Sequence, residues 1–89
     1  MSQAAKHVGR VRKLFPDWAE EVSRLALRSE AFRTICEDYG MAVEALELLE
    51  MRNLPQDVQK MQEYRLLVQD LERELKYELL AARPEEERR

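Results

Sequence analysis

Two side chains in this sequence, His7 and Cys36, are of types that serve as catalytic bases and nucleophiles. A nucleophilic cysteine needs a histidine or a helix N-terminus beside it to lower the pKa of its thiol. Cys36 is followed instead by Glu37 and Asp38, whose negative charges raise the pKa of a neighbouring thiol. We therefore expect Cys36 to be a small buried side chain of a helix and His7 to be solvated. The sequence indicates no catalytic residue, and we expect a protein that is not an enzyme.

Carboxylates are numerous, but their spacing does not match a metal site. Glu30, Glu37 and Glu44 recur every seven residues, which is typical of the solvated outer face of a helix. A di-iron site in a helical bundle needs inward Glu-x-x-His motifs, and a zinc finger needs four Cys or His ligands. The only glycines are Gly9 and Gly40, so no glycine-rich phosphate loop can form. We expect no metal and no cofactor.

Basic side chains are concentrated in residues 1–16, which contain no acid: Lys6, Arg10, Arg12 and Lys13. We interpret this segment as a flexible, solvated N-terminal arm. The alternative is a basic amphipathic helix that attaches the protein to a nucleic acid or to an anionic membrane surface, or that serves as an organellar transit peptide. The whole chain carries a net charge of −3, which opposes nucleic-acid binding.

The composition predicts an all-α fold. The chain has 89 residues, of which 45% are apolar and 37% charged, and it contains only two Gly and three Pro. Such a chain is too poor in turn residues for a sandwich or barrel and is dominated by strong helix formers. We expect one helical domain over residues 17–83, followed by a charged disordered tail over residues 84–89.

Local signals divide the domain into three helices. A short helix over about residues 17–28 begins after Pro16, and Ser29 is a candidate N-cap for a new helix over about 30–52. A continuous helix through Ser29 is the competing interpretation. Pro55 ends the second helix and begins the third, which extends over about 55–82.

The two long helices are expected to form an antiparallel hairpin, because the loop between them is too short for another arrangement. Heptad spacing pairs the small Ala42 with the large Tyr64 across the hairpin. The short helix is expected to fold back on the hairpin, with Trp18 beside Gly40, giving a three-helix, bundle-like architecture. The residues expected to hold the hairpin together are Phe32, Tyr39, Leu46, Val68, Leu71 and Leu75.

A second apolar face remains on the hairpin after this core is assigned. A short helix covers only part of it, and small domains often gain stability by oligomerisation. We therefore expect a non-enzymatic protein–protein interaction module that self-associates, with a homodimer or another protein as its partner. The expected interface residues are Met41, Leu48, Met51, Leu66 and Leu80.

The segment from Phe32 to Leu80 resembles small bacterial helical-hairpin proteins of the YdcH-like kind. The resemblance is carried by two long helices, a short polar turn and a second helix rich in Leu, Lys, Arg and Glu. The string over residues 32–39, with the apolar residues after it, also resembles short uncharacterised bacterial proteins. It implies an α-hairpin and no known activity. The short first helix, the basic arm and the absence of His from the helix over about 30–52 are departures from that pattern.

Targeting signals are not visible in the sequence. No stretch reaches the roughly 18 apolar residues of a membrane span, and the N-terminus lacks the apolar core of a secretory signal. We expect a cytoplasmic protein, with an organelle as the alternative if the basic segment is a transit peptide.

Overall fold

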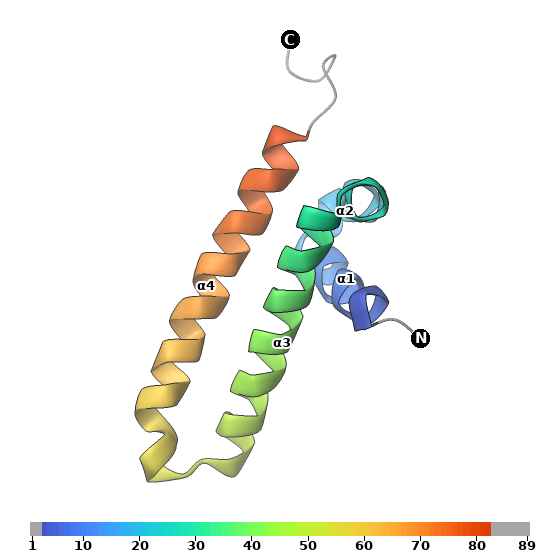
Figure 1. Ribbon diagram of the computed structural model, residues 1–89. Coiled ribbons are helices and arrows are strands. Elements are labelled where there is room, and N and C mark those ends of the chain that lie inside the picture. Colours follow the sequence, from blue (N-terminus) through green and yellow to red (C-terminus); the bar gives the residue numbers. More distant parts are fainter. Residues whose placement is uncertain (1–2, 83–89) are drawn as a thin grey trace.

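The computed structural model describes residues 3–82 and consists of helices joined by short connections (Figure 1). The tail expected at residues 84–89 lies outside the described residues. The elements, in chain order, are α1 (Gln3–Leu14), the 3-10 turn η1 (Pro16–Trp18), α2 (Ala19–Arg28), α3 (Glu30–Arg52), the 3-10 turn η2 (Pro55–Asp57) and α4 (Val58–Ala81). The described residues contain no strand, so the all-α fold class is confirmed.

The long helices α3 and α4 lie side by side and antiparallel, as expected (Figure 1). Asn53 ends α3 in the left-handed conformation, with φ 50° and ψ 46°, and the amide of Asn53 donates to the carbonyl of Leu49 over 3.0 Å. An asparagine tolerates this conformation better than most residues. Pro55 then opens η2, which leads directly into α4.

Ser29 separates α2 from α3. Its backbone is extended, with φ −126° and ψ 107°, and its hydroxyl accepts a hydrogen bond from the amide of Phe32 over 3.0 Å. This is the side-chain cap that satisfies an otherwise unpaired amide in the first turn of a helix. The break at Ser29 is therefore confirmed, and the continuous helix is excluded.

The N-terminal segment differs from the sequence-based expectation. Residues 3–14 form helix α1, which packs against α3 and α2, so the flexible arm expected over residues 1–16 is wrong for this part of the chain. His7 and Val11 lie four residues apart on its inner face, and both are fully buried. The expectation of a solvated His7 is therefore also wrong.

The predicted helix over residues 17–28 is divided in two. Pro16–Trp18 forms the turn η1, and α2 begins at Ala19. Trp18 does not lie in the space beside Gly40, because the imidazole of His7 from α1 fills it. The helix that covers α3 at this glycine is thus α1. The sequence analysis considered a helix in this segment only as the alternative, for attachment to a nucleic acid or a membrane, and did not predict that it packs on α3.

The core lies where α1 and α2 meet the upper half of the hairpin in Figure 1. Phe32 and Leu75 are fully buried at its centre, while Tyr39 and Leu71 are nearly so, as expected for residues that hold the hairpin. Leu46 and Val68 are only half-buried. The lower half of the hairpin extends beyond α1 and α2, which gives the molecule extents of 51 × 31 × 21 Å.

Candidate functional site

The five expected interface side chains are all exposed, with exposed fractions between 42% and 83%. Met41, Leu48 and Met51 lie on α3, and Leu66 and Leu80 lie on α4. Met41 and Leu48 are seven residues apart, and therefore share one face of α3. Leu66 and Leu80 are fourteen apart and share one face of α4. The structure thus divides the expected interface between two helix faces.

The face of α4 that carries Leu66 and Leu80 points away from the core. At 3.6 residues per turn, Leu75 lies about 180° around the helix from Leu66, and Leu75 is fully buried. We call the exposed side the outer face of α4 and define it by five residues that share an arc of about 80°. These residues are Leu66, Asp70, Arg73, Tyr77 and Leu80.

Tyr77 is a member of the outer face that the sequence analysis missed. Its side chain is 68% exposed, more than that of either leucine of the same face. The signal that identifies it is its separation of eleven residues from Leu66, which equals three helical turns. Tyrosine is an amphipathic side chain that is common in protein interfaces.

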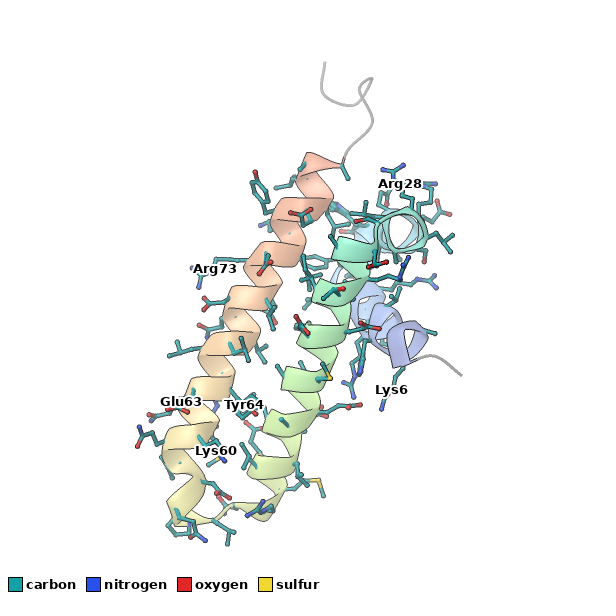
Figure 2. All side chains as sticks on the ribbon, viewed as in Figure 1. Lys6, Arg28, Lys60, Glu63, Tyr64 and Arg73 are labelled. Atoms are coloured by element: carbon teal, nitrogen blue, oxygen red, sulfur yellow. The ribbon has the colours of Figure 1, made fainter. Side chains whose placement is uncertain are left out.

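Two opposite charges lie between the apolar residues of the outer face. The guanidinium of Arg73 donates to the carboxylate of Asp70 over 2.7 Å, and Figure 2 shows Arg73 pointing away from α3. Both side chains are mostly exposed, 75% for Arg73 and 67% for Asp70. A solvated pair of this kind stabilises a helix by only a few tenths of a kcal/mol. Both charges therefore remain available to a partner.

A shallow hollow lies between α3 and α4 on another side of the hairpin. Exposed Met41 and Leu67 line it together with Ala42, Tyr64 and Leu71. Figure 2 shows Tyr64 between the two helices. Ala42 and Tyr64, the small and large residues paired in the sequence analysis, thus line the same space. The hollow extends the apolar surface of α3 toward α4.

The four basic residues of the N-terminal segment divide into two groups. Lys6 forms an ion pair with Glu44 of α3, and Arg10 lies 3.4 Å from the same carboxylate and 3.8 Å from that of Glu47. The lysine hydrogen bond, followed by the nearby positive charges, lowers the pKa of Glu44. Arg12 and Lys13 are exposed.

These ion pairs bear on the alternative of a basic attachment segment. Two of its four cations face acids of the same chain, and the helix that carries them is docked on α3. Affinity for a nucleic acid grows with the number of phosphates that basic side chains neutralise. The arrangement of α1 therefore favours a structural role for Lys6 and Arg10.

His7 and Gly40 form the closest approach between α1 and α3. A Cβ atom added at Gly40 would overlap Nδ1 and Cγ of His7 and would lie 2.7 Å from its Cε1. The imidazole is 1% exposed, and its Nδ1 has no hydrogen-bond partner among the described residues. The ring therefore packs directly against the backbone of α3, which only glycine permits. His7 has the role of a core residue.

Cys36 is buried in the same core and is a free thiol. Burial, with a smaller contribution from the negative charge of Glu37, raises the pKa of Cys36 to about 12. The expectation of a small buried side chain is confirmed. At neutral pH the thiolate that nucleophilic chemistry requires is scarcely populated.

Residues 3–82 contain neither a cluster of metal ligands nor a membrane-spanning helix. No group of three or more His, Cys, Asp or Glu side chains comes together there as a metal site would require. No helix of this part of the chain combines the length and the apolar character needed to cross a bilayer.

Comparison of the sequence with models of protein families and with curated proteins, and of the fold with solved structures, gives no significant match. The YdcH-like resemblance of residues 32–80 is therefore still a prediction. The function is therefore inferred from the outer face of α4 and the exposed apolar residues of α3.

Proposed function

We propose that this protein is a non-enzymatic interaction module that self-associates through the exposed apolar side chains of its α3–α4 hairpin. The observation that carries the proposal is the exposure of Leu66 and Leu80 on α4, together with Met41, Leu48 and Met51 on α3. Large exposed apolar side chains on the surface of a small domain are typical of a protein-binding surface.

The distribution of packing supports this function. Helix α1 packs beside the middle of α3, at Gly40 and Glu44, and α2 lies near the start of α3, so the lower end of the hairpin projects beyond both helices (Figure 1). Burial of apolar area is the main favourable term in protein association. A second hairpin laid on these side chains would remove them from water without changing the core.

The residues with reactive side chains support a non-enzymatic role. His7 is packed against Gly40, and Cys36 is a buried thiol with a raised pKa. His7 contributes to the contact of α1 with α3, and Cys36 belongs to the buried core. The proposed setting is the cytoplasm, since a free cysteine suits a reducing compartment.

The test is the mass of the full chain in solution, measured by light scattering after gel filtration over about a hundredfold range of concentration, which covers two decades of dissociation constant, or about 2.8 kcal/mol of association free energy. We expect a dimer that dissociates on dilution. The double variant Leu66→Glu/Leu80→Glu is expected to keep its helical circular dichroism and to stay monomeric, because it places four carboxylates in the interface of a dimer.

The matched control is Leu27→Glu. Leu27 is 84% exposed on α2, away from the hairpin, so the same change of chemistry should leave association intact. A wild-type chain that is monomeric throughout the range contradicts self-association. A dimer that persists in the double variant shows that the α4 residues are the wrong surface.

A further inference from the structure

The outer face of α4 has a residue order that matches its own reversed copy. We propose that it pairs with the same face of a second copy of this chain, antiparallel and about a twofold axis. Leu66 then packs against Tyr77 of the second copy, and Asp70 meets Arg73 of the second copy. This inference rests on the proposed self-association and adds the surface, the orientation and the register.

The spacing of the outer face suits helix–helix packing. Leu66, Asp70, Arg73 and Tyr77 follow one another at intervals of four, three and four residues. This is the alternation of a and d positions that forms the seam between two paired helices. All four side chains are exposed and lie opposite the buried face of α4. A partner helix can therefore pack along them without displacing α3.

The order of the residues is self-complementary. Asp70 and Arg73 are placed symmetrically about the midpoint between residues 71 and 72, and so are Leu66 and Tyr77. A twofold axis through that midpoint places each acid opposite a base and each leucine opposite a tyrosine. A twofold interface requires that the same patch serve as both partners, and this patch meets the requirement.

Charge distinguishes the antiparallel from the parallel arrangement. A parallel pair in register would place Asp70 against Asp70 and Arg73 against Arg73, and like charges brought together at an interface oppose binding. In the antiparallel pair each Arg73 lies between the Asp70 of its own helix and that of the second copy. The 2.7 Å contact within one helix places the guanidinium on this face, beside Asp70.

The charge order also favours a second copy over an unrelated partner. The outer face supplies both signs of charge, and the apolar pair Leu66 and Tyr77, in the order that its own reversed copy needs. Antiparallel pairing also opposes the dipoles of the two α4 helices, which is electrostatically favourable. The paired residues from Leu66 to Tyr77 span about 17 Å of helix.

The experiment exchanges the charges in two single variants of the full chain. Asp70→Arg places only bases, and Arg73→Asp only acids, at the centre of the homodimer. We expect each alone to weaken self-association by about tenfold or more. An equimolar mixture should form a heterodimer, since every acid then faces a base. Light scattering measures the mass, and native mass spectrometry identifies the mixed species.

The matched control is Glu21→Arg. Glu21 and Arg24 form the same kind of exposed pair three residues apart, with 3.1 Å between the charged atoms, but on α2. Breaking it should leave the dimer unchanged. Circular dichroism of each variant checks that the helices are intact.

Orientation is tested by cysteine cross-linking, which the buried Cys36 does not disturb. A mixture of Leu66→Cys and Tyr77→Cys chains should oxidise to a mixed disulfide, whereas Leu66→Cys alone would cross-link readily only in a parallel pair. Predominant cross-linking of Leu66→Cys to itself overturns the proposed orientation.

The two proposals fail in different ways. A wild-type chain that never dimerises overturns self-association, and this pairing with it. A wild-type dimer that tolerates Asp70→Arg, or two single variants whose mixture stays monomeric, overturns the pairing alone. A dimer that tolerates Asp70→Arg but is broken by Met41→Glu/Leu48→Glu also overturns it, and assigns self-association to α3.

Discussion

Replacing Gly40 by alanine tests the packing of α1 on α3 directly. In a helix interior, Gly→Ala normally stabilises by about 1 kcal/mol, because alanine loses less backbone entropy on folding. At Gly40 the added Cβ overlaps the ring of His7, which is fully buried. Overpacking of a well-packed core costs about 1–3 kcal/mol. Because the overlap is severe, we expect an overpacking cost of about 3 kcal/mol. After the gain of about 1 kcal/mol from alanine, the free energy of unfolding should fall by about 2 kcal/mol.

The assay is urea denaturation followed by circular dichroism and by the fluorescence of Trp18, the only tryptophan. Trp18 packs against the core between α1 and α2, so its emission reports whether α1 stays docked. Thermal unfolding should show a Tm lower by about 8–16 °C, given about 4–8 °C per kcal/mol for a domain of this size.

Gly9→Ala is the matched control, because a Cβ at Gly9 meets nothing within 4 Å. This variant should be more stable than the wild type, since Gly9 lies within α1. Adding His7→Ala to Gly40→Ala should recover part of the loss, because the ring that causes the overlap is removed. If Gly40→Ala is as stabilising as Gly9→Ala, the packing described for α1 and α3 is incorrect.

Two further predictions concern titratable groups. Lys6 and nearby cations lower the pKa of Glu44, so its stabilising contribution is present at neutral pH and is lost as the pH falls through the folded-state value. Glu44→Gln should therefore flatten the acid limb of the stability–pH profile, as measured by urea denaturation from pH 7 to about pH 3; an unchanged profile would contradict the pairing. Cys36, buried and with a pKa of about 12, should react with an aromatic disulfide reagent at pH 8 only after unfolding in urea. Rapid labelling of the folded chain would show that the core around Cys36 opens readily.

The elements governed by local chemistry were predictable from the sequence. Ser29 caps α3 through its own hydroxyl, and Asn53 and Pro55 act through their own backbone preferences. Each of these signals lies within three residues of the boundary that it sets. The bounds of α3 agree with the prediction for this reason.

Helix α1 was not predictable in the same way, because what holds it is distant in sequence. Its bases have no acid within the segment, and their partners Glu44 and Glu47 lie more than thirty residues away. A glycine in the middle of α3 was recognised as a space for an aromatic ring. The sequence does not tell which ring fills it, and the structure assigns His7 in place of Trp18.

The expected interface was identified by residue type but not by face. Periodicity predicted that Leu66 and Leu80 lie outside the core, yet it did not separate them from Met41 and Leu48. Tyr77 was missed because it does not belong to the heptad of either leucine. Assigning each of these residues to a helix face required knowing which side of α4 packs against α3.

The elongated shape of the molecule has a consequence for its tumbling in solution. Amide N–H bonds lie close to the axis of their helix, and α3 and α4 follow the long direction of the molecule, whereas α2 is seen end-on in the same view (Figure 1). Rotation about the long axis is fast, and it hardly reorients bonds parallel to that axis. Nitrogen-15 relaxation should therefore report longer apparent correlation times for α3 and α4 than for α2. Two hairpins side by side form a particle that is wider than the monomer but nearly as long. Dimerisation would therefore slow the tumbling and reduce the difference in apparent correlation time between α2 and the two long helices.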